Sequence, residues 1–279
     1  MSLRKLPEIR ADHRMSAAQF DVRPEALECW EPAVRASAAE SETSVSMYGR
    51  IGETWDGEGV TSKRISAALR NIGAREVTVN VNSPGGDYFE GIAIYNLLRM
   101  HPAKVTVRVM SLAASAASVI AMAGDEVWMG EGSRLMIHNA WAIAMGNRHD
   151  LRDAADWLEP LDEAMAEVYA SRTGKPAAEM AALMDKETWI PAKRALEDGF
   201  ATGLLSRSDI LQDTQAHGHH KALAMVEASM ARAGHSRSVR RDALKALFSG
   251  TPGAAEDDAM PGAGDAAALL LSLTQSLKV

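Results

Sequence analysis

The chain has 279 residues, a formal net charge of -7 and a single cysteine. Its hydrophobic share of 47% is ordinary for a soluble globular protein with a real core. The acidic balance argues against nucleic-acid binding, which needs clustered Lys and Arg, and the lone Cys29 excludes a disulfide framework. The N-terminus has no apolar signal segment, and no apolar run reaches the ~18 residues of a membrane span. We therefore expect a cytoplasmic protein that binds neither nucleic acid nor membrane.

Composition divides the chain into three parts. Residues 1–44 are irregular and interrupted by prolines, which predicts an N-terminal extension. Residues 45–207 alternate strand-like and helix-like segments, the pattern of an α/β domain with a largely parallel sheet. Residues 208–279 predict a helical and then flexible C-terminal tail, because 251–267 are rich in Pro, Gly, Ala and acidic residues.

The hydrophobic periodicity of the central part predicts its elements one by one. In chain order these are a strand at 44–51, a helix at 62–72, a strand at 76–82, a helix at 91–100, a strand at 104–111, a helix at 113–123, short strands at 126–129 and 134–137, a long amphipathic helix at 150–174, and short helices at 176–184 and 191–199. A further helical stretch is predicted at 217–250.

Three segments could carry chemistry. Asn82–Gly86 reads NSPGG between a strand and a helix, where glycines let backbone N–H groups face a phosphate or an oxyanion. Ser111–Ser118 contains Ser115 among alanines at a predicted strand-to-helix junction, although a serine there is usually an N-cap. His138 ends a short strand, a position where a histidine is more often structural. Together, however, a serine, a histidine and a glycine turn are what acyl transfer needs: a nucleophile, a base and oxyanion donors.

These segments resemble the Clp protease proteolytic subunit family (peptidase S14) and its phage relatives, the head-maturation proteases. The glycine motif matches at Asn82–Gly86, the Ala-Ala-Ser frame at Ala113–Ser115 with Ala123-Gly124 downstream, and the Ser-Arg-x-Met-Ile-His motif at Ser133–His138. The resemblance spans about residues 45–207. It implies a spiral of β-α-β units, as in Clp proteases and crotonases, with a long handle helix from about 150 to 172.

The resemblance also implies roles. Ser115 would be the nucleophile, His138 the general base, and the N–H groups of Gly86 and Ala116 the oxyanion hole. The family has an aspartate just before the segment that reads Thr188–Ala192 here, which favours Glu187 as the triad acid and leaves Asp185 as the alternative.

The activity implied is a serine endopeptidase that forms a homo-oligomeric ring and cleaves polypeptides. The phage relatives and the tail favour processing of capsid and scaffold proteins during head maturation, in the host cytoplasm or inside the procapsid. One alternative is a general degradative subunit that works with a partner ATPase, which this chain would need as a separate protein because it has no GxxxxGK[ST] motif. Others are a catalytically silent scaffold, or an acyl-CoA enzyme of the crotonase type, against which the Ser–His pair counts.

No cofactor or metal is expected. The only histidine-rich run, which contains His217, His219 and His220, lacks Cys or carboxylate companions at ligand spacing and is interpreted as a solvated loop.

Overall fold

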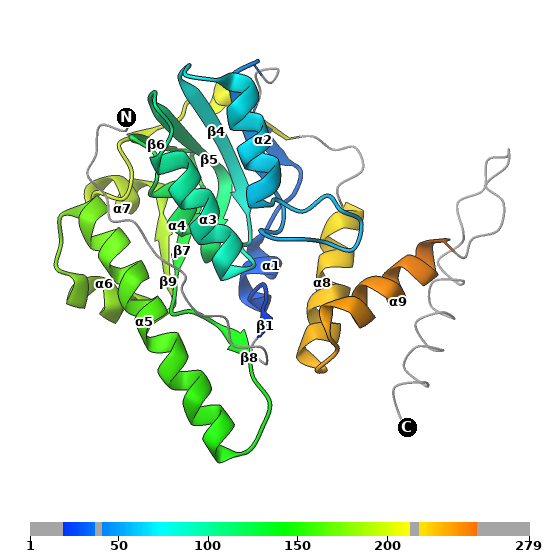
Figure 1. Ribbon diagram of the computed structural model, residues 1–279. Helices are drawn as coiled ribbons and strands as arrows, with labels where there is room; N and C mark the ends of the chain where they lie inside the picture. The colour runs from blue at the N-terminus through cyan, green and yellow to red at the C-terminus, as the bar shows by residue number, and fades with distance from the viewer. Residues whose placement is uncertain (1–18, 37–40, 213–217, 250–279) are drawn as a thin grey trace, which may run out of the picture. The chain divides into compact units, whose positions relative to one another are not determined.

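The computed structural model describes residues 19–36, 41–212 and 218–249 (Figure 1). The chain divides into two compact units, Met1–Asp242 and Ala243–Val279, and the fold and the site described below belong to the first. None of the helices in the described ranges is both long and apolar enough to cross a membrane.

The described elements follow one another in this order: β1 (Gln19–Phe20), α1 (Pro24–Cys29), β2 (Val34–Ala36), β3 (Ser44–Tyr48), α2 (Ser62–Ile72), β4 (Val77–Ser83), α3 (Tyr88–Arg99), β5 (Val105–Ala114), α4 (Ala116–Ala121), β6 (Glu126–Met129), β7 (Arg134–Ile137), β8 (Ala142–Ile143), α5 (Arg148–Thr173), α6 (Ala177–Met184), β9 (Thr188–Pro191), α7 (Ala192–Glu197), β10 (Gly203–Leu204), the 3-10 turn η1 (Arg207–Asp209), β11 (Ile210–Gln212), α8 (Gly218–Arg232) and α9 (Arg237–Ser249).

The main sheet is largely parallel, as the alternation of strands and helices predicts. Its order is β10-β6-β5-β4-β3, with each neighbour parallel. Strand β7 continues the sheet by pairing in parallel with the C-terminal half of β5, and β9 pairs antiparallel with β7. The C-terminal ends of β4, β5 and β7 therefore lie close together, and the candidate residues follow these three ends.

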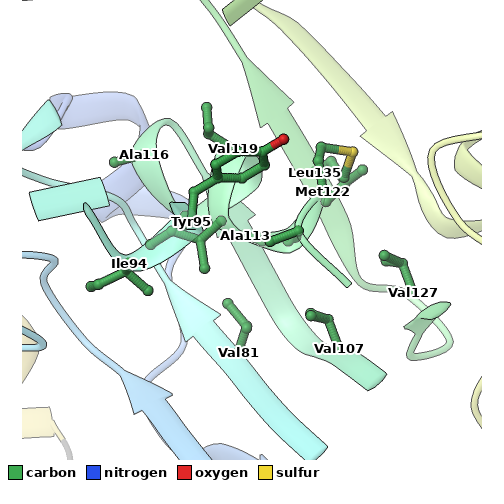
Figure 2. Packing of buried hydrophobic residues seen from close by; sticks show 14 of the residues in the cluster. Val81, Ile94, Tyr95, Val107, Ala113, Ala116, Val119, Met122, Val127 and Leu135 are labelled. Carbon is green, nitrogen blue, oxygen red and sulfur yellow. The ribbon is translucent and has the colours of Figure 1, made fainter. Parts of the chain in front are cut away.

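One face of this sheet is covered by α2, α3, α4 and α5. Valines of β4, β5 and β6 pack there against Ile94 and Tyr95 of α3 and Val119 of α4, all of them nearly or fully buried (Figure 2). Small residues let α3 approach α4 closely: a Cβ on Gly91 would lie 2.8 Å from the Cβ of Ala116. The alanine-rich stretch after β5 thus contains a buried helix, α4. The close contact with α3 fixes the position of its first residue, Ala116.

A smaller core lies on the opposite face of β5 and β7. There Leu112 and Met136 pack against residues of α1 and α8. Strand β2 pairs with β11, so segments before and after the central part also meet. The parts predicted as extension and tail therefore contribute packed elements in their described portions.

The predicted elements need three corrections. The helix predicted from Ala113 begins at Ala116, because Ala113 and Ala114 continue β5 by pairing with β7. The stretch predicted as one helix at 217–250 is two helices, α8 and α9, separated after Gly234, which has a positive φ of 86°. His219 and His220 belong to the first turn of α8 and not to a loop, whereas His217 and the linker at 251–267 lie outside the described residues.

Candidate active site

Ser115 stands between β5 and α4 in a strained backbone conformation, with φ 55° and ψ -127°. A positive φ in a residue other than glycine is uncommon and persists only where the surroundings enforce it. Here the Ser115 N–H donates to the carbonyl of Met136 at 2.9 Å, and the Ser118 hydroxyl donates to the Ser115 carbonyl at 2.6 Å. The Ser115 side chain makes no capping hydrogen bond to α4, so the ordinary N-cap role does not explain it.

The glycine turn after β4 lies against Ser115. A Cβ on Gly85, where φ is +90°, would lie 2.6 Å from the Cβ of Ser115 and 2.7 Å from the Ala114 carbonyl oxygen. A Cβ on Gly86 would lie 2.1 Å from the carbonyl oxygen of Ile51. Both positions exclude any side chain: Gly85 brings backbone next to the serine, and Gly86 packs against the backbone of Ile51. Ala116 is the first residue of α4, and the first N–H groups of a helix have no intrahelical partner.

His138 reaches the same point from β7. The parallel register of β5 and β7 pairs Ala113 with Leu135 and Ala114 with Met136, so the residues that follow each strand end lie side by side. Ser115, His138, Gly86 and Ala116 all line one small pocket. Its other lining residues are Phe20, Tyr88, Asn139, Ala140, Trp141 and Met165.

The surroundings of His138 favour the neutral imidazole. The side chain is 5% exposed. Burial, and then the positive charge of Arg23, lower the pKa of His138 to about 4 from an ordinary 6.5. At neutral pH the ring is therefore unprotonated and can accept a proton.

The two candidate triad acids, Glu187 and Asp185, bond to groups other than His138. In the antiparallel register the last pair is Ile137 with Thr188, and Glu187 directly precedes that pair in a turn, where its N–H donates to the Met184 carbonyl and its φ is 49°. The Glu187 carboxylate, however, pairs with Arg23 at 2.5 Å, and Asp185 accepts from the side-chain amide of Asn139 at 2.8 Å. Neither is among the described residues that line the pocket.

A third carboxylate, Asp162 of α5, lies near the site. It accepts a hydrogen bond from the Ala140 N–H at 2.5 Å, and burial raises its pKa to about 6. Asp162 thus fixes the backbone two residues beyond His138.

Sequence reasoning missed the part of the site that comes from the N-terminal segment. Phe20 lines the pocket, and the Arg23 guanidinium lies 5.6 Å from the ring centre of Trp141 and bonds to Glu187. The only local signal was an apolar residue and a basic one shortly before Pro24. Among the described residues, no group of His, Cys, Asp and Glu side chains could hold a metal ion.

Comparison with known proteins gives a family match over this region. The Clp protease family model matches residues 41–208, more than half of the chain. ATP-dependent Clp protease proteolytic subunit 3 of Rhodococcus jostii is 30% identical over 135 residues, which cover 47% of this chain and 66% of the relative. Proteolytic subunit 1 of Mycobacterium bovis is 26% identical over 144 residues, which cover 51% of this chain and 72% of the relative.

A solved structure shares the fold. A ClpP1 mutant from Listeria monocytogenes superposes with a TM-score of 0.51 at 20% sequence identity, and the match covers 60% of this chain and 94% of that one. The expected Clp-type spiral of β-α-β units is therefore the fold of this chain, with α5 in the position of the predicted long helix (Figure 1).

Proposed function

The chain belongs to the Clp protease family, and we propose that it is a serine endopeptidase with Ser115 as nucleophile, His138 as general base and Glu187 as the triad acid. The observation that carries the proposal is the convergence of Ser115, His138, Gly86 and Ala116 on one pocket. The strained Ser115 backbone adds to it, since such strain concentrates at functional sites.

The reaction follows from these groups. The Ser115 oxygen adds to a peptide carbonyl carbon while its proton passes to His138, and the N–H groups of Gly86 and Ala116 bind the resulting oxyanion. The peptide C–N bond then breaks as His138 gives that proton to the leaving amine. Water hydrolyses the acyl ester by the same route, which restores Ser115 and releases the new carboxyl group.

Glu187 is favoured over Asp185 as the acid because it directly precedes Thr188, which pairs with Ile137 next to His138. Its carboxylate would orient the imidazole and stabilise the imidazolium formed in each step. To do so it must exchange its present bond with Arg23 for one to His138.

Labelling with a fluorophosphonate probe, read by mass spectrometry of the intact chain, tests the nucleophile. We expect a single adduct on the wild type, a slower reaction in His138→Gln, and none in Ser115→Ala. Ser66→Ala is the matched control, because Ser66 lies on α2, accepts a hydrogen bond from Arg70 and does not line the pocket of Ser115. An adduct that survives in Ser115→Ala would contradict the assignment.

The finer role we propose is processing of capsid and scaffold proteins by a homo-oligomeric ring. What supports it is the resemblance to head-maturation proteases together with the residues beyond the match to the family model. Incubation of wild type beside Ser115→Ala, followed by mass spectrometry, tests self-processing. Loss of a terminal segment in the wild type alone would support a maturation protease. Two intact chains would instead favour a degradative subunit that acts with a partner ATPase.

A further inference from the structure

We propose that residues 19–23, here called the inhibitory segment, occupy the substrate cleft and hold the chain in an inactive resting state. The inference rests on the proposed function, because the segment inhibits only if Ser115 and His138 are the catalytic pair. Four independent contacts of the segment support it.

The first contact is between backbones. Strand β1 pairs antiparallel with β8, with Gln19 opposite Ile143 and Phe20 opposite Ala142. Strand β8 begins four residues after His138. An extended peptide held beside the serine needs a strand edge next to it for main-chain hydrogen bonds, and β1 takes the edge that β8 offers.

The second contact fills the pocket. Phe20 lines the same pocket as Ser115 and His138 and is 5% exposed. Its ring centre lies 5.5 Å from those of Tyr88 and Phe89 and 5.4 Å from that of Trp157. An apolar side chain of a substrate would have to displace Phe20 from this aromatic cluster.

The third contact removes the triad acid. Arg23 holds the Glu187 carboxylate at 2.5 Å, and the side chains of Arg23 and Glu187 are 17% and 41% exposed. The Arg23 cation thereby occupies the carboxylate that the proposed triad needs and puts a like charge near any imidazolium that forms. Both effects oppose the step in which His138 accepts the Ser115 proton.

The fourth contact indicates that the segment blocks the site and is not cut there. The Phe20 carbonyl oxygen accepts a hydrogen bond from Arg237 at 3.1 Å, and Arg237 also pairs with Asp87 at 2.6 Å. A scissile carbonyl must instead accept from the oxyanion-hole N–H groups. The next residue, Asp21, is anchored by Arg50 at 3.0 Å and by Arg240 at 2.5 Å.

The test compares rates of fluorophosphonate labelling at Ser115 in full-length chains. Arg23→Gln should raise the labelling rate roughly tenfold. It releases the Glu187 carboxylate, and the charge-assisted hydrogen bond that is lost is worth about this factor. Phe20→Ala should raise the rate further. The matched control is Arg70→Gln on the exposed surface of α2, where Arg70 bonds to Ser66, and it should label at the wild-type rate.

A reversible disulfide provides a second test in which the same folded chain is compared in its oxidised and reduced forms. Residues 19 and 143 are directly opposed in an antiparallel pair, at a spacing that suits a disulfide. Gln19→Cys with Ile143→Cys, in an Arg23→Gln and Cys29→Ser background, should label slowly when oxidised and at least tenfold faster after reduction.

The outcomes separate the two proposals. If Ser115 labels equally fast in wild type, Arg23→Gln and both redox forms of the locked chain, the peptidase assignment stands and the inhibitory segment is wrong. If no folded form labels at Ser115, the proposed function fails and this inference fails with it.

Discussion

At the centre of the site, the close approach of Gly85 and the strained backbone of Ser115 depend on each other. Ser115 has a positive φ, and Gly85 approaches it so closely that no side chain fits between them. Such geometry costs on the order of 1–3 kcal/mol at a residue and persists only if the surroundings enforce it. The single-residue changes that matter most are therefore those that alter this contact or the charge around His138.

Gly85→Ala should abolish labelling of Ser115 and destabilise the fold. The added Cβ would meet the Ser115 Cβ at 2.6 Å, in addition to the penalty of a positive φ. Gly174→Ala is the control: its φ is +75° with no atom within 4 Å, so it should cost only ~1 kcal/mol. Urea unfolding compares the two, and equal losses would show that the contact with Ser115 is unimportant.

Arg23→Gln should raise the pKa of His138. The positive charge of Arg23 is lost and the Glu187 carboxylate is released, and both changes favour the imidazolium, so the value should rise from about 4. In the pH profile of the labelling rate, the decrease at acidic pH should move to higher pH by the same amount, since the protonated ring cannot accept a proton. NMR titration of the ring, assigned by its loss in His138→Gln, measures the shift, and an unchanged titration would contradict a charge effect of Arg23.

The same lowered pKa makes stability depend on pH. Because the unfolded chain binds a proton near pH 6.5 and the folded chain only near 4, His138 contributes stability above about pH 6.5. That contribution is lost progressively as the pH falls toward 4.

At the scale of elements, side chains that bond to the backbone of a neighbouring element hold the site together. Arg172, at the end of α5, is 3% exposed and donates to the Phe200 carbonyl at 3.0 Å and the Gly124 carbonyl at 2.7 Å. Gly124 lies between α4 and β6, so this one guanidinium connects α5 to the turn that follows α4. Tyr169 of the same helix bonds to Ser118.

Arg172→Met should therefore lower the free energy of unfolding by about 2–4 kcal/mol, because it leaves two buried carbonyl groups without their donor. Arg194→Met is the control, since its ion pair with Asp198 is exposed on α7 and should be worth less than ~1 kcal/mol. Chemical denaturation compares the two, and a loss no larger than that of the control would contradict a structural role for Arg172.

At the scale of the first compact unit, a buried charge cluster connects segments from both ends of the sequence. Asp21 and Glu227 are the acids, and Arg50 and Arg240 the bases, all at most 8% exposed. The two acids balance the two bases, so the cluster adds no net charge to the interior. It joins the inhibitory segment to α8 and α9, so the position of this segment depends on both helices.

Arg240→Met should cost about 3–5 kcal/mol, since removing one partner leaves a buried carboxylate uncompensated. Its neighbour provides the control: Arg241 pairs with Asp242 at the surface, so Arg241→Met should change stability by less than ~1 kcal/mol. Arg240→Met should also expose the chain near Asp21 to limited proteolysis. Similar unfolding curves for the two variants would contradict the importance of the cluster.

The sequence by itself determined the alternating strands and helices and the NSPGG turn. These features are local, because periodicity and glycine positions depend on residues close together in the chain. Its resemblance to the Clp proteases predicted Ser115 and His138 as a pair. It also favoured Glu187 as the triad acid, which stays a prediction. The division into extension, protease domain and tail stays a prediction.

Only the tertiary structure decided what Phe20 and Arg23 contact. Arg23 and Glu187 are 164 residues apart in sequence, and Arg240 and Asp21 are 219 apart. An ion pair between distant segments has no local signature, because its geometry depends on how the intervening elements pack. The same reason explains the late start of α4: strand pairing with β7 outweighs the helix propensity of Ala113 and Ala114.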